Sequence, residues 1–213
     1  KFSQPGLGCA PGAVTISTGW VMSVVLFALA AVCAAFVKLP NVWWVAGLVA
    51  VYSANVAAYS VAIKKVVIAD VLSLSLGFVL RVLGGCAAAG VSPSTWLLNC
   101  TLFFAMFLAF GKRLGERRTV EDASAIRSVQ GEYTDELLRM ATVVTGVALL
   151  VTYAGYLESR QEQYTMALPG FAAGFNLLWL TMIPATFGLL RAIVLLETGR
   201  YDDPTEIVSK DLS

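Results

Sequence analysis

Long apolar stretches alternate with short polar connections along the chain. The six apolar stretches cover about residues 17–37, 42–63, 66–89, 94–111, 137–157 and 167–196. A helix needs about 20 mostly apolar residues to cross the hydrocarbon core of a bilayer. The pattern therefore predicts an all-α protein, a polytopic transmembrane helical bundle of about six spans. In the long sixth stretch we expect Pro184 to kink the helix.

The composition supports a membrane protein and excludes several other classes. Hydrophobic residues make up 58% and charged residues 14% of the chain, against about 45–50% and about 25% in soluble domains. With 15 basic and 14 acidic residues, the chain lacks the basic excess of a nucleic-acid-binding protein. It contains no histidine, which excludes a Ser-His-Asp triad and histidine-ligated zinc. We interpret residues 1–213 as a single transmembrane domain.

Basic residues are distributed unequally between the two sets of connections. The side that holds the connections around residues 64–65 and 112–136 and the chain ends carries eleven basic residues: Lys1, Lys64, Lys65, Lys112, Arg113, Arg117, Arg118, Arg127, Arg139, Arg200 and Lys210. The other side carries only Lys38 and Arg160. An excess of basic residues marks the cytoplasmic side of a membrane protein. We therefore expect residues 112–136 and both termini on the cytoplasmic side of the inner membrane.

The third apolar stretch carries two charged residues, Asp70 and Arg81. Ionisable residues within a membrane helix are costly, so they are candidates for function. Their separation of eleven residues places both on one side of a helix, about 16 Å apart along its axis. Gly77, Gly84 and Gly85 lie on or near that side and allow either close helix packing or space for a ligand. The alternative is a helix cap for Asp70 and a snorkelling or paired Arg81.

A second charged cluster, residues 111–118, follows the fourth apolar stretch, with the sequence Gly-Lys-Arg-Leu-Gly-Glu-Arg-Arg. If the helix continues, Lys112 and Glu116 share one face and Arg113 and Arg117 share another. The cluster is either a basic membrane anchor or a site for a polyanion.

Further polar residues are expected on the same membrane side as this cluster. Tyr59 and Lys64 end the second stretch, Tyr133 precedes the fifth, and residues 202–206 follow the sixth. Such a mixture of carboxylates, cations and tyrosines suits a metal-bound diphosphate.

These motifs resemble the UbiA superfamily of intramembrane transferases, and most closely its decaprenyl-phosphate phosphoribosyltransferase branch. The matching segments are residues 59–64, 70–71, 77–81 with 84–85, 111–113 with Glu116, 132–134, 203–206 and 210–211. Enzymes of the superfamily that act on aromatic acceptors usually carry a second aspartate four residues after the first. Leu74 stands at that position after Asp70, which favours the phosphoribosyl branch.

The chain also departs from the superfamily pattern. The first aspartate-rich motif, Asn-Asp-x-x-Asp-x-x-x-Asp, is absent and is expected to lie before Lys1. Members of the superfamily are expected to have about nine spans. The resemblance thus implies a partial nine-helix fold that lacks half of its metal site, and we expect the 213-residue chain alone to be inactive.

The resemblance implies a Mg²⁺-dependent transferase of cell-envelope (cell-wall) biosynthesis. It would move 5-phosphoribose from phosphoribosyl diphosphate to a polyprenyl (decaprenyl) phosphate. Asp70 and Glu116 would be catalytic, with Asp70 also contacting the metal. The substrate-binding residues implied are Tyr59, Lys64, Arg81, Lys112, Arg113 and Tyr133.

Two alternatives stay open at this point. A UbiA-type prenyltransferase, which moves an isoprenoid from its diphosphate to an aromatic or other acceptor, shares the fold and the magnesium. A membrane transporter would use Asp70 and Arg81 along an ion path, although the polar residues gather at one membrane face. The sequence is compatible with a homo-oligomer but does not fix the oligomeric state.

Overall fold

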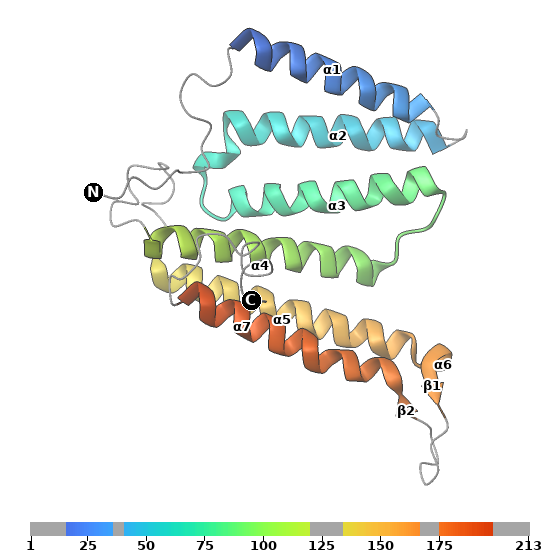
Figure 1. The fold of residues 1–213 in the computed structure, drawn as a ribbon, viewed down its shortest axis with the longest axis vertical. Coiled ribbons are helices and arrows are strands. Elements are labelled where there is room, and N and C mark those ends of the chain that lie inside the picture. The colour runs from blue at the N-terminus through green and yellow to red at the C-terminus, as the bar shows by residue number, and fades with distance from the viewer. Residues whose placement is uncertain (1–15, 36–40, 120–133, 167–174, 198–213) are drawn as a thin grey trace.

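The computed structural model describes residues 16–35, 41–119, 134–166 and 175–197, and the structural statements below refer to these residues. Six long helices are joined by short elements (Figure 1). The elements are α1 (Ile16–Ala35), α2 (Asn41–Val61), the 3₁₀ helix η1 (Ile63–Lys65), α3 (Ala69–Ala89), α4 (Thr95–Thr119), α5 (Asp135–Ser159), α6 (Gln161–Tyr164), β1 (Thr165–Met166), β2 (Phe175–Asn176), the 3₁₀ helix η3 (Leu177–Thr181) and α7 (Met182–Glu197).

The long helices run up and down in chain order. Helices α1 to α4 lie side by side, and α5 and α7 pack against α4 at the edge away from α1 (Figure 1). At one end of the bundle α2, α4 and α7 finish and α3 and α5 begin. The described basic residues Lys64, Lys65, Lys112, Arg113 and Arg139 lie in or next to these helix ends, and we call this end of the bundle the basic end.

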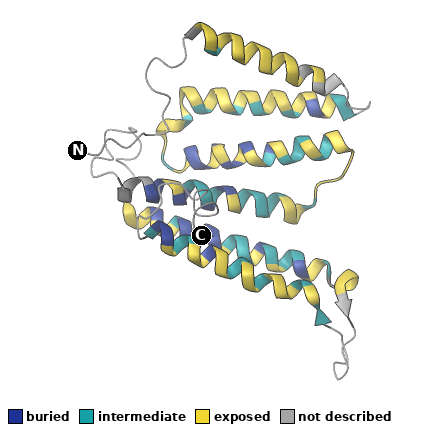
Figure 2. Ribbon diagram, in the orientation of Figure 1, coloured by how far each residue is buried: buried dark blue, intermediate teal, exposed yellow. Residues whose placement is uncertain are grey.

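The outer surface of the helices is apolar enough to face lipid. Five helical segments are long and apolar enough to span a membrane: Asn41–Val61, Ala69–Ala89, Thr95–Gly115, Asp135–Ser159 and Leu177–Glu197. In α1 the apolar stretch found is shorter, Ser17–Ala30. Large side chains such as Trp20, Phe27, Trp43 and Phe187 are exposed (Figure 2). Exposed apolar area of this extent is stable in lipid and not in water, so this is an integral membrane protein with the predicted all-α bundle.

The sixth apolar stretch differs from the prediction of one long helix. Helix α7 begins only at Met182, after η3 and a two-residue antiparallel pairing of β1 with β2. Asn176 closes this region, because its Nδ2 donates to the Leu157 carbonyl and its Oδ1 accepts from the Leu178 N–H. Pro184 lies in the first turn of α7, where backbone N–H groups have no acceptor within the helix. The predicted kink at Pro184 stays a prediction.

Helices α4 and α5 make the most extensive helix pair, and small residues allow their close approach. Gly146 of α5 faces Phe107 of α4 and Leu189 of α7, and a Cβ there would lie 3.0 Å from Leu189 Cδ2. Nearer the other end, Gly155 accommodates the indole ring of Trp96, and a Cβ would lie 2.5 Å from Trp96 Cη2. Glycine at these positions therefore sets the distance between the helices.

The packing of Trp96 on Gly155 predicts the effect of adding one methyl group. Gly155→Ala should lower the thermal stability of the purified protein in detergent, because the indole ring must move and overpacking typically costs about 1–3 kcal/mol. Gly188→Ala is the matched control, since a Cβ at Gly188 meets nothing within 4 Å. That variant should be neutral or gain up to about 1 kcal/mol from helix propensity. Equal melting temperatures for the two variants would contradict the packing described.

Candidate functional site

The connection between α2 and α3 presents two cations and then turns sharply. Lys64 and Lys65 lie in η1 and are exposed. Ile68 has φ 69° and ψ −43°, and the Ala69 N–H donates to the Val67 carbonyl at 2.8 Å. This is a γ-turn of the rare, strained form, and positive φ is unusual for a β-branched residue. Strain of this kind persists only where the surrounding contacts hold it.

Two residues after Ile68, Asp70 lies in the first turn of α3. Its Oδ1 accepts a hydrogen bond from the Val71 N–H at 2.7 Å, and its Oδ2 forms a salt bridge with Nη2 of Arg113 at 2.5 Å. Asp70 is 1% exposed and Arg113 is 4% exposed. An acidic side chain is also favoured by the dipole at a helix N-terminus. The ion pair joins the start of α3 to the basic end of α4.

Apolar side chains seal the pair from the bundle side. Val71, Phe110, Leu114 and Leu138 form a buried cluster contributed by α3, α4 and α5. Val71 and Leu114 are the sequence neighbours of the two charged residues, so the ion pair adjoins a dry core. Removing one partner from such a pair leaves a buried charge, at a typical cost of about 3–5 kcal/mol.

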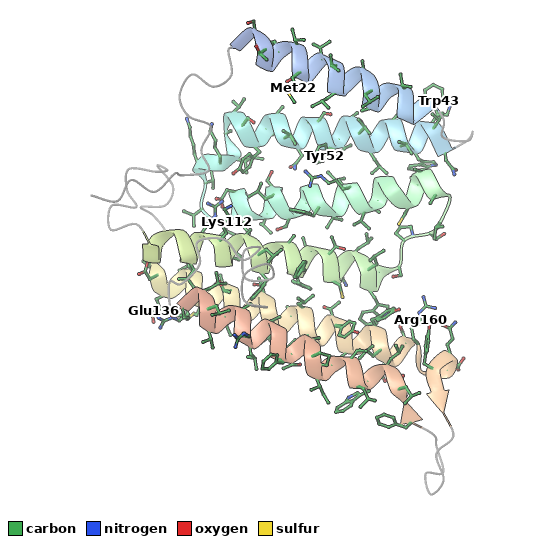
Figure 3. The ribbon with its side chains drawn as sticks, viewed as in Figure 1. Met22, Trp43, Tyr52, Lys112, Glu136 and Arg160 are labelled. Carbon is green, nitrogen blue, oxygen red and sulfur yellow. The ribbon has the colours of Figure 1, made fainter. Side chains whose placement is uncertain are left out.

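The remaining helices of the basic end are held by a second ion pair. Arg139 of α5 donates through Nε and Nη2 to the two carboxylate oxygens of Glu197 in α7, at 2.6 and 2.9 Å. This pair is partly exposed, and exposed pairs contribute at most about 1 kcal/mol. Lys112, next to Arg113, is exposed. Figure 3 shows Lys112 and Glu136 at this end and Trp43 and Arg160 at the other.

A second polar region lies deeper, between α2 and α3. Asn55 and Ser73 exchange two hydrogen bonds of 2.9 Å, one to the Ser73 carbonyl and one from its hydroxyl. Gly77 lies beside this pair, and a Cβ there would be in ordinary contact, 3.6 Å from Tyr52 Cε2. The predicted role of Gly77 in close helix packing stays a prediction. At Gly84 and Gly85 a Cβ would meet nothing within 4 Å, so of the two predicted roles the open space there agrees with room for a ligand and not with close helix packing.

Arg81 lies near the middle of α3 and faces this region. Its Nη2 donates to the Tyr52 hydroxyl at 2.5 Å, and its Cζ lies 5.1 Å from the ring centroids of both Tyr52 and Phe78. An arginine at the centre of a membrane helix costs about 2.5–3.5 kcal/mol on insertion scales. Each cation–π contact returns about 0.5–2 kcal/mol. The two rings and the hydroxyl therefore offset much of this cost without neutralising the charge.

These residues enclose a space that we call the α2/α3 groove. Its volume is about 310 Å³. Polar and apolar side chains alternate along it, and it extends from Arg81 towards the basic end. The lining residues are Tyr52, Asn55, Val56, Tyr59, Ser73, Leu74, Gly77, Phe78 and Arg81.

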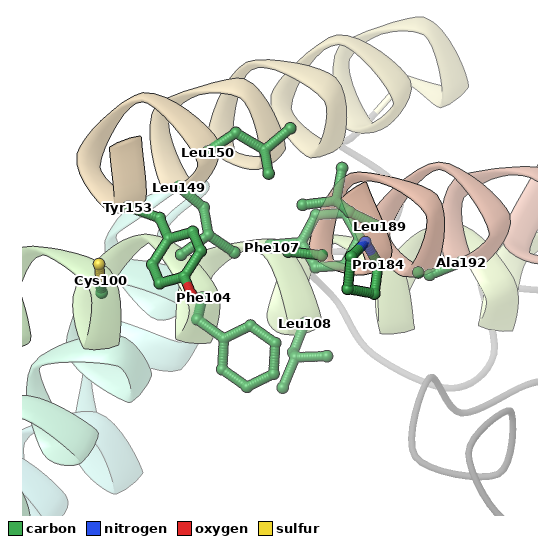
Figure 4. Close-up of a pocket in the computed structure, with 12 residues that line it drawn as sticks. Cys100, Phe104, Phe107, Leu108, Leu149, Leu150, Tyr153, Pro184, Leu189 and Ala192 are labelled. Atoms are coloured by element: carbon green, nitrogen blue, oxygen red, sulfur yellow. The ribbon is translucent and has the colours of Figure 1, made fainter. Parts of the chain in front are cut away.

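A larger and almost wholly apolar pocket of about 450 Å³ lies between α4, α5 and α7. Side chains from the three helices, including Phe104, Leu108, Leu149 and Pro184, line it (Figure 4). Tyr153, at its polar edge, shares a hydrogen bond of 2.7 Å with the Thr181 hydroxyl. This lining is suited to a hydrocarbon and not to a charged group.

The structure brings only some of the predicted site residues together. Asp70 and Arg113 are in contact, whereas Tyr59 and Arg81 line the α2/α3 groove. Asp70 binds α4 and Arg81 binds α2, so the two charges of α3 do not share a site even though their spacing places them on one side of the helix. Lys64 and Lys112 are exposed at the basic end.

Two predicted residues cannot be placed in the site. Helix α4 continues to Thr119, as expected for the shared face of Lys112 and Glu116, but the Glu116 side chain lies outside the described residues. Tyr133 and residues 202–206 also lie outside them. Their predicted roles stay predictions.

The described geometry of Asp70 does not fit a magnesium ligand. One carboxylate oxygen accepts from a backbone N–H, and the other is bound to a guanidinium that would repel a cation. Among the described residues, no group of three or more Asp, Glu, Cys or His side chains could hold a metal ion. The prediction of a metal contact at Asp70 therefore has no support from this arrangement, and we assign no step to a metal there.

Sequence reasoning missed three residues of the α2/α3 groove: Tyr52, Asn55 and Ser73. A signal was present, since residues 52, 55 and 59 follow a helical spacing of three and four and place polar side chains on one stripe of an apolar helix. Tyrosine and serine are common enough in membrane helices that this stripe does not identify its partner.

Comparison with known proteins gives a consistent relationship. The chain is 33% identical over 175 residues to a decaprenyl-phosphate phosphoribosyltransferase of Mycolicibacterium smegmatis. The matched region covers 79% of this chain and 54% of that protein. The chain is 29% identical to the protein of the same name from Corynebacterium glutamicum, over 95% of this chain and 58% of that protein. It is 26% identical to the one from Mycobacterium tuberculosis, over 95% of this chain and 63% of that protein.

These similarities confirm the resemblance to decaprenyl-phosphate phosphoribosyltransferases that the order of motifs predicts. No family model matches the chain. The chain spans a little over half the length of the curated relatives it matches.

The buried ion pair predicts a specific pattern of stabilities. Asp70→Leu or Arg113→Met alone should lower the free energy of unfolding in detergent by about 3–5 kcal/mol, because each leaves one buried charge. The double variant should recover most of that loss, since two apolar side chains can join the adjacent cluster. Arg139→Met, which breaks the exposed pair, should cost no more than about 1 kcal/mol. Additive losses in the double variant would show that Asp70 and Arg113 are not coupled.

Proposed function

We propose that the protein takes part in transfer of 5-phosphoribose from phosphoribosyl diphosphate to a polyprenyl phosphate such as decaprenyl phosphate. The similarity to decaprenyl-phosphate phosphoribosyltransferases over most of the chain supports this reaction. The observation that carries the proposal is the basic end of the bundle. There, exposed Lys64, Lys65 and Lys112 surround helix ends that the Asp70–Arg113 pair holds together.

The reaction makes one bond and breaks one bond at the anomeric carbon of the donor. A phosphate oxygen of the lipid attacks C1 of the ribose, the bond from C1 to the diphosphate oxygen breaks, and diphosphate leaves with the bonding electrons. Positive charge develops on the ribose and negative charge on the leaving group. Fixed cations near the diphosphate stabilise that transition state, and we assign this role to Lys64, Lys65 and Lys112.

The position of these lysines suits two substrates of different solubility. The basic end is the end of apolar spans, so a water-soluble donor can reach it from the aqueous side while a lipid reaches it from the bilayer. The excess of basic residues supports a cytoplasmic position for this end, and we propose that the protein lies in the inner membrane. The apolar pocket between α4, α5 and α7 offers space for part of an isoprenoid chain.

The remaining predicted residues differ in how far the structure exposes or describes their side chains. Asp70 acts through Arg113 by fixing α3 against α4, because neither side chain is open to solvent. A direct phosphate contact for Arg113 stays a prediction, and so do the catalytic role of Glu116 and the substrate contact of Tyr133. Mg²⁺ would supply further positive charge to a diphosphate leaving group. Dependence of the reaction on Mg²⁺ is part of the proposal, with ligands other than Asp70.

A donor assay separates this proposal from the prenyltransferase alternative. Membranes containing a version of the protein that spans the full length of its relatives should form a radiolabelled phosphoribosyl lipid from phosphoribosyl diphosphate, polyprenyl phosphate and Mg²⁺. They should form no product from polyprenyl diphosphate and 4-hydroxybenzoate. Lys64→Gln and Lys112→Gln should each lower the rate about tenfold or more, the usual loss for a hydrogen bond to a charged group, whereas Arg160→Gln at the other end should not. Isoprenoid transfer without any phosphoribosyl lipid would overturn the proposal.

A further inference from the structure

The α2/α3 groove holds a charge whose described partners are all neutral. Arg81 contacts the hydroxyl and ring of Tyr52 and the ring of Phe78. Within the described parts of the chain, no carboxylate forms a salt bridge with it. Arg81 and Tyr52 lie near the middle of α3 and α2, the two spans on either side of the groove. The guanidinium thus lies at the depth of the bilayer core, where an uncompensated charge is most costly.

The geometry leaves the guanidinium able to bind an anion. Its Cζ lies 5.1 Å from two aromatic ring centroids, and one of its five N–H donors binds Tyr52. The other donors lie in the same plane and match the oxygens of a phosphate, which arginine binds through paired hydrogen bonds. The Tyr52 hydroxyl, already held by Arg81, can donate its own proton to the same oxygens.

The lining of the groove indicates that the anion belongs to a lipid. Val56, Leu74 and Phe78 are apolar and exposed on the helix surface, so one side of the groove is open to hydrocarbon. Towards the basic end it is lined by Tyr59 and by Ser73, which lies one turn beyond Asp70. Any phosphate must lose hydration to reach this depth, but only a lipid phosphate also has a chain that can lie against these lipid-facing side chains.

We propose that the α2/α3 groove binds the phosphate group of a long-chain lipid monophosphate, with Arg81 as its cation and Tyr52 as a second donor. That this lipid is the polyprenyl phosphate acceptor rests on the proposed function. The binding of a lipid monophosphate in the groove does not rest on it. Arg81 lies about 16 Å from Asp70 along α3, and its side chain points back towards the helix N-terminus. The groove would therefore hold the lipid phosphate deeper in the membrane than the basic end, and it extends towards that end.

Binding of farnesyl phosphate to the purified protein in nanodiscs tests this proposal without any donor substrate. The wild-type protein should bind farnesyl phosphate at least about tenfold more tightly than farnesol or inorganic phosphate, since only the first has both the charge and the chain. Arg81→Gln should weaken farnesyl phosphate binding about tenfold or more, the loss typical of a charged hydrogen bond, and should leave farnesol binding unchanged. Arg81→Lys should fall between the two.

Two further variants make the outcome decisive. Arg160→Gln is the matched control, because Arg160 also lies over an aromatic ring, that of Tyr156, but at the other end of the bundle; it should bind as the wild type does. Leu74→Trp fills the groove without changing its charge and should also weaken binding, which keeps the test valid if Arg81→Gln fails to fold. Unchanged affinity in Leu74→Trp or in folded Arg81→Gln would overturn the proposal.

Comparison of the ligands gives a second way to refute it. Inorganic phosphate that binds as tightly as farnesyl phosphate would show that the groove is not a lipid site. Because no donor is present, failure of this binding is distinct from failure of the transferase assay. A protein that binds farnesyl phosphate through Arg81 but transfers no phosphoribose would refute the proposed function alone.

Discussion

The arrangement of the basic end depends on the buried ion pair between Asp70 and Arg113. Two helices in a bilayer gain little from the hydrophobic effect, since lipid is as apolar as their side chains. A charged pair shielded from both lipid and water is costly to separate, so it fixes one helix against the other. Here it fixes the first turn of α3 against α4, and with it the strained turn at Ile68 and the preceding lysines of η1. Lys112, beside Arg113, is placed by the same contact.

Helix α3 connects two polar regions with different properties. Its first turn is joined to α4 by the ion pair, beside a buried apolar cluster and near the exposed lysines. Further along, Ser73, Gly77 and Arg81 face α2, where hydrogen bonds and aromatic rings surround an accessible groove. Exposed lysines of η1 and α4 thus lie at the basic end, and Arg81 lies deeper in the membrane, in α3. We propose that the former bind a water-soluble anion and the latter a lipid-borne one.

The spans could be predicted because bilayer thickness sets the length of an apolar helix, and α2, α3 and α5 begin and end within a few residues of the expected positions. The sixth stretch was less predictable, since apolar composition alone does not distinguish the 3₁₀ helix η3 and the β1–β2 pairing from helix. In the candidate site, Asp70 and Arg81 were identifiable as charges in an apolar span. Their partners were not, because periodicity within one helix gives no information about which neighbour a side chain meets. Arg113 looked like a phosphate ligand among other basic residues, and Tyr52 like any aromatic residue of a membrane helix.

We propose that Asp70 and Arg113 act by positioning the lysines of the basic end; the competing prediction is a direct contact of Arg113 with a donor phosphate. This proposal is tested most directly by the dissociation constant for phosphoribosyl diphosphate of the variant in which both residues are apolar, Asp70→Leu/Arg113→Met. If the pair only holds α3 against α4, this folded variant should bind the donor within about threefold of the wild type, a change of less than 1 kcal/mol. A variant that is as stable as the wild type but has lost donor binding would show that one of the two charges contacts the substrate or its metal directly, and would contradict the account.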